Sequence, residues 1–527
     1  MSLFDAFLLE PHPFEVWIAK RTDAKGSGTA SDPFDGSTAS KLDSILNGLA
    51  VNTHVHLGPG SFDTAGYADG EATGWQPKAG MKIEGSGVGV TTLRLVNTGQ
   101  NKLYFAVGHA LTNTLDFFEL SDVTIDCNLA GQSPSQVACG AVRVMGNYCR
   151  IRRVKAIHWG TKYGGNRCYV IAAIIADPPS GVNEIVDAGI EDCIVVDPDP
   201  TLIPSGAVVT AIHAGGLENA TSEEAFGKAP YIRNCFVDAG SPAAAPEFHG
   251  LSMSWCRGGT VEGNQIHNFK IGGPFQDKTS TRDIIIRNNH YRNVFKGPYF
   301  YLRTYPSSMG TATLSKSGST ITATTSSNHK LSNGDRVYIT ASNSSFSKWA
   351  EVTVTAPNEF TYQTSIAGTP GTATSIQKLF GIDRLLIEGN LISLATQTSG
   401  DLIGIQLEDL QPTSLQDPIY PAYQHGQVIF RNNKVRYVDG AYQTSPAFVG
   451  YGIQTFGARS AIVQDNIVES VPANPIRHER CATIQYFNNR TPAGVLVRGY
   501  DSVAGRKLDE LETEAEDALV LSMFNER

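Results

Sequence analysis

Three short stretches share one pattern: LLIEGNLI at residues 385–392, VIFRNNKV at residues 428–435 and AIVQDNIV at residues 461–468. Each has an apolar run, a polar turn that ends in Asn, and a second apolar run. The same turn recurs along the chain at Asn128, Asn264, Asn289, Asn390, Asn433 and Asn466, with Cys193 and Cys235 in the same place in two further turns. Because Asn tolerates left-handed backbone, we expect it at a tight bend between strands, its amide stacked on the next Asn.

The spacing of these turns indicates a stack of coils. Asn264 and Asn289 are 25 residues apart, and Asn433 and Asn466 are 33 apart. A coil of three short strands and three turns needs at least about 20 residues, and its loops absorb the excess. The 101 residues between Asn289 and Asn390 therefore predict an insertion. A β-sandwich is disfavoured because it requires hairpin turns between antiparallel strands.

These motifs resemble the right-handed parallel β-helix superfamily, which includes pectate lyases, polygalacturonase-like hydrolases and phage tailspikes. The resemblance covers roughly residues 20–505 and implies an all-β, single-stranded right-handed parallel β-helix. It implies little about activity, because the superfamily contains lyases, hydrolases, esterases and pure binders. The stretch from GSGTASDPFDGS through KLDSILNGL to THVHLGPGSFD resembles an N-terminal coil in which a short helix covers the open end.

We divide the chain into five segments. They are an N-terminal segment with a capping helix at 1–50, a first part of the β-helix at 51–308, an inserted small antiparallel β-barrel at 309–378, a second part of the β-helix at 379–505, and a C-terminal amphipathic α-helix at 506–527. Within the insertion, HKLSNGDRVYI followed by NEFTYQ resembles a small β module of phage tail and other particle-bound proteins. The last helix, with Leu508 and Leu511 on its apolar face, either caps the last coil or forms a homotrimer seam.

Composition excludes several functions. The net charge is −9, and no basic cluster indicates a nucleic-acid partner. No run reaches the roughly 20 apolar residues of a membrane helix, and the N-terminal stretch lacks the pattern of a secretory signal peptide. The eight cysteines form no CxxC pair, so we expect buried thiols and no zinc ribbon. We expect no cofactor: no calcium cluster is visible, although one assembled across coils would not be visible in the sequence.

The resemblance also implies where chemistry would lie, because carbohydrate-active β-helices use the outer face of one parallel sheet as a groove. We assign this sheet to the strands GAVRVM, GLSMSW, GGPFQD, GPYFYLR, GIQLED and GIQTF. Alternation then points one set of side chains inward: Val142, Val144, Leu251, Met253, Phe300, Leu302, Ile405 and Leu407. From the outward set we select, as candidate polysaccharide-binding residues, Tyr299, Tyr301, Gln276, Gln406, Gln454 and Arg143.

The candidate catalytic residues are Asp277, Arg303 and Glu408. Without the insertion their strands belong to consecutive coils, so Asp277 and Glu408 would be roughly 10 Å apart, close to the separation in inverting glycosidases. Glu247 and His249 are secondary candidates, with a hydrogen-bonded loop-end pair as the alternative. The paired-Asp and Gly-His-Gly motifs of polygalacturonase-like hydrolases are absent from the sequence.

Three functions follow from this sequence. The first is an extracellular or particle-associated spike that binds, and in one version cleaves, surface polysaccharide, with tail proteins as partners. The second is a free polysaccharide lyase or glycoside hydrolase. The third is a structural or adhesive β-helix without catalysis. The missing signal peptide, the tail-like insertion and the C-terminal helix favour the first.

Overall fold

The computed structural model describes most of the chain. The described residues are 14–21, 26–69, 71–112, 115–164, 167–173, 186–216, 227–240, 247–276, 281–301, 310–329, 331, 333–378, 382–395, 400–408, 425–437, 448–469, 476–479, 481, 483–492, 494, 499–501 and 506–508.

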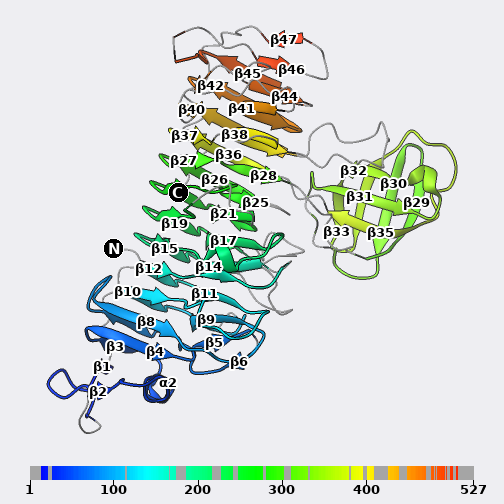
Figure 1. Ribbon diagram of the computed structural model, residues 1–527. Helices are drawn as coiled ribbons and strands as arrows, with labels where there is room; N and C mark the ends of the chain where they lie inside the picture. Colours follow the sequence, from blue (N-terminus) through cyan, green and yellow to red (C-terminus); the bar gives the residue numbers. More distant parts are fainter. Residues whose placement is uncertain are drawn as a thin grey trace, which may run out of the picture.

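The described chain winds into a right-handed parallel β-helix, as predicted, with strands stacked along one axis from the N-terminal to the C-terminal end (Figure 1). Two sheets run along this axis. The larger, here the long sheet, holds the strands before and after the Asn turns. Its described strands are β1 (Phe14–Ala19), β2 (Phe34–Asp35), β3 (Thr53–Leu57), β4 (Gly60–Thr64), β7 (Lys82–Gly85), β8 (Thr91–Leu95), β10 (Glu119–Asp126), β12 (Arg150–Ile157), β15 (Gly189–Glu191), β16 (Ile194–Val195), β18 (Gly227–Lys228), β19 (Tyr231–Arg233), β20 (Phe236–Asp238), β22 (Cys256–Arg257), β23 (Thr260–Glu262), β24 (Gln265–His267), β26 (Thr281–Arg287), β27 (His290–Val294), β36 (Ile382–Glu388), β37 (Leu391–Leu394), β39 (His425–Arg431), β40 (Lys434–Tyr437), β42 (Ala458–Gln464), β43 (Ile467–Val468) and β45 (Thr483–Phe487).

The second sheet, here the site sheet, contains the strands that sequence analysis assigned to the functional face. Along the axis its described strands are β6 (Glu71–Ala72), β5 (Tyr67–Ala68), β9 (Leu103–Gly108), β11 (Ala138–Arg143), β14 (Arg167–Ala172), β17 (Val208–His213), β21 (Glu247–Ser252), β25 (Phe275–Gln276), β28 (Tyr299–Tyr301), β38 (Gly400–Glu408), β41 (Phe448–Phe456), β44 (Ile476–Glu479), β46 (Gly499–Asp501) and β47 (Arg506–Leu508), with β13 (Gly160–Thr161) paired to β11.

The core lies inside the coils and consists of aligned apolar side chains. Ile286, Ile387, Phe430 and Val463 occupy one position on four successive strands, β26, β36, β39 and β42, and all four are fully buried. This repetition explains the apolar run before each turn, because every coil must bury the same face on the coil beside it. All eight cysteines are free, and seven of them are buried, as the sequence predicted.

The Asn ladder is confirmed from Asn264 onward and extends to Asn489. In each step the Oδ1 of one Asn accepts hydrogen bonds from the backbone N–H and the side-chain amide of the Asn one coil earlier. For Asn390 above Asn289 both distances are 3.0 Å, and the last step joins Asn466 to Asn489. Cys235 continues the column downward, since its N–H donates to Asn264 at 2.9 Å. The ladder satisfies buried polar groups at every bend.

Two details of the Asn prediction are wrong. The left-handed residue is the one before the ladder Asn, as at Asn288 (φ 56°), Gly389 (φ 64°) and Asn432 (φ 54°). The ladder Asn therefore supplies its amide, and its neighbour supplies the bend. Asn128 is also not a member, because it adopts φ 50° itself and donates to Leu95 O.

Charges alternate in a column beside the ladder, and from Glu191 to Arg431 each lies two residues before an Asn or Cys of the turns. The members, each opposite the next in the parallel register, are Arg152, Glu191, Arg233, Glu262, Arg287, Glu388 and Arg431. Ion pairs follow the register: Arg287 Nε lies 2.9 Å from Glu262 Oε1, and Arg431 Nε lies 2.6 Å from Glu388 Oε2. We call this column the charge ladder; it neutralises side chains that the stacking forces into contact.

At the N-terminal end, one α-helix of the described chain, α2 (Ala39–Gly48), lies against the first coils (Figure 1). The hydroxyl of Thr38 caps it by accepting from Lys41 N, and Leu42 and Leu46 join the core. The helix therefore covers the open end, as expected from KLDSILNGL.

The insertion forms a separate seven-stranded antiparallel sheet that closes nearly into a barrel beside the β-helix (Figure 1). Its strands are β29 (Ala312–Ser317), β30 (Thr320–Thr325), β31 (Arg336–Ala341), β32 (Lys348–Glu351), β33 (Thr353–Ala356), β34 (Glu359–Gln363) and β35 (Thr372–Lys378). It has its own core, which includes Ile321, Val337, Ile339 and Phe360. The chain leaves the β-helix after β28 and returns at β36.

The predicted C-terminal helix does not begin at residue 506. Residues Arg506–Leu508 form β47, which pairs antiparallel with β46 because the chain folds back at the end of the site sheet. The rest of that prediction, residues 509–527, lies outside the described residues.

Candidate functional site

The site sheet brings three predicted strands together across the insertion. Tyr299 of β28 lies opposite Gln406 of β38, and Tyr301 lies opposite Glu408. Gln406 in turn lies opposite Gln454 of β41. The stacking of coils therefore joins residues that are more than a hundred positions apart in the sequence.

The predicted inward side chains are confirmed wherever the structure describes them. Val142, Val144, Leu251, Met253, Phe300, Ile405 and Leu407 are all fully buried. Leu302 lies outside the described residues. The residues between them must then lie on the outer face of the site sheet.

Five side chains on this outer face form a connected group, here called the β28–β41 cluster: Lys296, Tyr299, Gln406, Glu408 and Gln454. The Tyr299 hydroxyl donates to Glu408 Oε2 at 2.8 Å. Lys296 Nζ donates to Gln406 Oε1 at 3.2 Å and lies 4.2 Å from the centre of the Tyr299 ring. Gln406 Nε2 donates to Gln454 Oε1 at 2.8 Å. One network therefore holds an ammonium, a phenol, a carboxylate and two amides across three strands.

Burial divides this cluster into two layers. Gln406 and Gln454 are each 4% exposed and Tyr299 is 9% exposed, whereas Lys296 and Glu408 are half-buried. The two Gln residues, predicted to contact substrate, mainly orient their neighbours in this structure. Lys296 and Glu408 are the charged groups of the cluster that a ligand would reach first.

Glu408 is positioned from two directions. Tyr299 donates to its carboxylate, and His425 Nε2 lies 3.3 Å from its backbone carbonyl. A carboxylate that accepts a hydrogen bond from a phenol is held in one orientation, which suits a base or a ligand for hydroxyl groups.

Four of the predicted residues are described in part or not at all. Asp277 and Arg303 lie outside the described residues, so their separation from Glu408 stays a prediction. Gln276 and Tyr301 are placed through their backbone only, on β25 and β28. In the register Tyr301 lies opposite Glu408 of the cluster. Gln276, one coil before the cluster, lies opposite the inward-facing Phe300, so its predicted outward position disagrees with the register.

The remaining predicted residues lie elsewhere on the site sheet. His249 Nε2 is 3.3 Å from Glu247 Oε1, and β25 and β28 separate this pair on β21 from Glu408 on β38. Arg143 is buried on β11, where its Nη1 donates to Asp69 at 2.8 Å and its guanidinium lies 4.7 Å from the centre of the Phe105 ring. The structure therefore does not bring these three residues to the cluster.

Sequence reasoning missed Lys296 and a neighbouring pair, Tyr451 and Arg477. Lys296 lies opposite Ile403, and Ile403 lies opposite Tyr451, so these residues form an adjacent row on the same face. Arg477 of β44 donates to the Tyr451 hydroxyl at 2.9 Å. Lys296 lies three positions before Tyr299, and Tyr451 lies three positions before Gln454. In a strictly alternating strand, residues three positions apart point to opposite faces, so Lys296 and Tyr451 were not selected. The sequence did contain a clue: Gly297 follows Lys296 and Gly452 follows Tyr451, and at these glycines the strand departs from alternation.

The described residues contain no helix that is long and apolar enough to cross a membrane.

Comparisons with known proteins found similar solved structures only at low sequence identity. No protein-family model matches the chain, and no curated protein matches it in sequence. Similar solved structures include a mutant tailspike protein of E. coli bacteriophage HK620 in complex with a pentasaccharide (9% identity, 88% of this chain and 61% of that chain, TM-score 0.47). Others are a family 28 exopolygalacturonase of Yersinia enterocolitica (8% identity, 87% and 75%, TM-score 0.37) and the surface protein and adhesin PfbA of Streptococcus pneumoniae (9% identity, 88% and 93%, TM-score 0.34). The chain thus spans about three fifths of the tailspike's length.

Proposed function

We propose that this protein is a tailspike- or tail-fibre-like β-helix that binds surface polysaccharide on the outer face of its site sheet. The observation that carries the proposal is the β28–β41 cluster. A phenol, an ammonium, a carboxylate and two amides are fixed by hydrogen bonds and one cation–π contact across three consecutive strands.

The chemistry of the cluster suits a chain of sugars. Carboxylate and ammonium groups bind hydroxyls, and an acidic sugar would pair with Lys296. The side chains stand on strands about 4.8 Å apart, so the face repeats along the helix axis, as an extended polymer requires. Rigid β-structure also lowers the entropy cost of binding.

Cleavage of the polysaccharide is a second candidate function, favoured by the contact between Tyr299 and Glu408. Glu408 would act as base, and Asp277, two strands away on the same sheet by sequence position, would be the second carboxyl group. Two strand spacings put the pair roughly 10 Å apart, near the separation of inverting glycosidases, with Arg303 between them.

Association with a particle forms the finer part of the proposal. The inserted barrel leaves the β-helix directly after β28, a strand of the cluster, and has a core of its own. Such a module can contact a partner or the polysaccharide without disturbing the coils. We propose that the protein is extracellular or particle-borne and assembles as a homotrimer with tail proteins as partners.

The first test is binding and cleavage across a panel of bacterial and plant polysaccharides, by calorimetry, reducing-end release and unsaturated-uronate absorbance. The variants are Glu408→Gln, Tyr299→Phe and Asp277→Asn. Glu191→Gln is the matched control, because it removes a half-buried carboxylate from the long sheet, away from the site sheet. We expect Glu408→Gln to weaken binding at least tenfold and the control to bind like the wild type.

The outcomes separate the three functions. Cleavage that both Glu408→Gln and Asp277→Asn abolish establishes a depolymerase at this site. Binding without cleavage establishes a recognition spike. Wild-type protein that binds no polysaccharide refutes the proposal in favour of a structural β-helix, and an active monomer in sedimentation equilibrium favours a free enzyme.

A further inference from the structure

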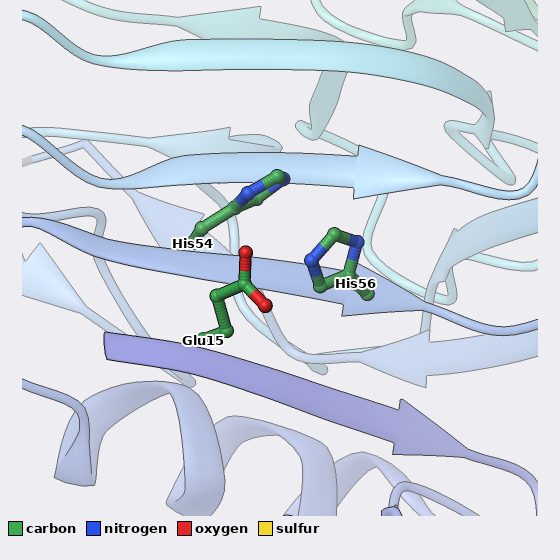
Figure 2. A group of neighbouring side chains, drawn as sticks. All are labelled: Glu15, His54 and His56. Carbon is green, nitrogen blue, oxygen red and sulfur yellow. The ribbon is translucent and has the colours of Figure 1, made fainter. Parts of the chain in front are cut away.

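A second group of polar side chains lies at the N-terminal end, far along the axis from the β28–β41 cluster. Glu15 of β1 and His54 and His56 of β3 point toward one another, with the Glu15 carboxylate directed between the two imidazole rings (Figure 2). One potential ligand atom from each residue lies within 4.8 Å of the other two. Two imidazoles and one carboxylate form the ligand set that divalent zinc-like ions prefer.

Strand pairing holds these residues in place. β1 and β3 are parallel neighbours, with Glu15 opposite His54 and Trp17 opposite His56. Glu15, His54 and His56 therefore share the outer face of the long sheet, because residues two apart on a strand point the same way. The register of two strands, and no flexible loop, sets the distances.

Aromatic contacts fix the imidazole rings. The His56 ring stacks on Trp17 with centroids 4.6 Å apart and planes 15° apart, and the His54 ring centroid lies 4.0 Å from that of His56. His56 Nε2 is buried and has no hydrogen-bond partner in the structure as described. A buried, unsatisfied ring nitrogen is costly in free energy, and a metal ion would satisfy it.

A further carboxylate supports the group. Glu84 Oε2 lies 3.0 Å from His54 Nε2, and carboxylates in this position commonly orient metal-binding imidazoles. Lys82 is the cation beside the group, and its Nζ lies 3.2 Å from the same Glu84 oxygen. The lysine charge is therefore paired with Glu84.

We propose that Glu15, His54 and His56 bind one divalent transition-metal ion, with Zn²⁺ the best match, and that Glu84 is a positioning residue for His54. The ion would join β1 to β3 and so fasten the first strand of the described chain to the coil above it. Sequence analysis expected no metal, and this site assembles across coils, where spacing along the chain gives no signal. The proposal is independent of polysaccharide binding.

The test uses the full chain without an affinity tag, freed of metal by a chelator. Titration with ZnCl₂ by calorimetry should show one strong site per chain, and CoCl₂ should give the visible absorption of Co²⁺ bound to nitrogen and oxygen ligands. Saturating Zn²⁺ should raise the unfolding temperature, because the ion binds only the folded site.

Variants decide the assignment. His56→Gln and Glu15→Gln should each weaken Zn²⁺ binding at least tenfold, and Glu15 is exposed, so its replacement leaves the fold intact. Glu84→Gln should weaken binding less and retain one site. The matched control is His290→Gln, which removes another outward imidazole of the long sheet. Binding that is unchanged in His56→Gln and Glu15→Gln, or absent from the wild type, would overturn the proposal.

Discussion

At the residue scale, the Asn ladder links the sequence motif to stability. Asn390 uses both the oxygen and the nitrogen of its side-chain amide. Oδ1 accepts two hydrogen bonds from Asn289, and Nδ2 donates to Ile286 O at 3.1 Å and to Asn433 Oδ1 at 2.9 Å. All these groups are buried, so none can turn to water. The side chain is therefore a connector between three coils.

Replacement of Asn390 by Ala should lower the free energy of unfolding by about 3–5 kcal/mol, because it leaves several buried donors and acceptors unsatisfied. Urea denaturation measures the loss. Asn432→Gly is the control at an equivalent bend, where φ is 54° and Gly adopts that conformation freely; we expect a change below about 1 kcal/mol. Equal losses in both variants would show that the loss is not specific to the amide of the ladder.

Two imidazoles on the long sheet predict a pH dependence. Burial lowers the pKa of His290, and the positive charges of Arg436 and Arg292 act in the same direction. Burial also lowers the pKa of His267, although the carboxylate of Asp238 opposes it. The folded state therefore binds fewer protons than the unfolded state below about pH 6.5, and the free energy of unfolding falls as the pH falls through that range.

We expect the urea midpoint to be lower at pH 5.5 than at pH 7.5, and the double variant His267→Gln/His290→Gln to lose less than the wild type over the same interval. If the variant and the wild type lose the same amount, other groups control the acid sensitivity.

Sequence reasoning succeeded at this scale where one residue type repeats in one chemical role. It identified the ladder Asn and the Cys193 and Cys235 positions, but it placed the left-handed conformation one residue late. Asn is compatible with both roles, so the residue type alone cannot assign them; Gly263 and Gly389, directly before ladder Asn residues, were the available clue.

At the element scale, the charge ladder is the feature that sequence reasoning overlooked. The alternation of Glu and Arg appears in the turns themselves, as EGN, RNN, EGN and RNN at 262–264, 287–289, 388–390 and 431–433. It has meaning only once the coils are aligned in register. The strands assigned to one sheet do share it. The depth of Gln406 and Gln454 was not foreseen, because burial of an outer face depends on what covers it.

Gln464 ends the alternation, since it lies opposite Arg431. Gln464→Glu should extend the ladder and raise the free energy of unfolding by about 0.2–1 kcal/mol, whereas Gln464→Lys should lower it by a similar amount. Urea denaturation at low and high salt measures both. The difference in the free energy of unfolding between the two variants should become smaller as the salt concentration rises. If the variants do not differ at low salt, the charges of the ladder do not contribute to stability.

At the scale of the whole molecule, the inserted barrel and the β-helix are built as separate units. The barrel strands pair with one another, and β28 stacks on β38 as if the insertion were absent. The sequence revealed the insertion through the break in Asn spacing. It could not reveal the group of Glu15, His54 and His56 that we propose as a metal site, since only the stacked strands bring those residues together.

Deletion of residues 309–378, with a short Gly/Ser link, should leave the β-helix folded and change its free energy of unfolding by only about 1 kcal/mol, because loop-closure entropy depends weakly on length. The isolated barrel should unfold cooperatively on its own. Circular dichroism and thermal melts of both fragments measure this. Loss of the β-helix on deletion would show that the two units depend on each other.

The charge ladder also gives the stack a parity. Coils alternate between acidic and basic members, so a coil that skipped its neighbour during folding would set Glu against Glu or Arg against Arg. If evolution added or removed one coil within the charge ladder, two like charges would become neighbours. If it added or removed two coils, the alternation would be preserved. We therefore expect this part of the β-helix to change in length by two coils at a time.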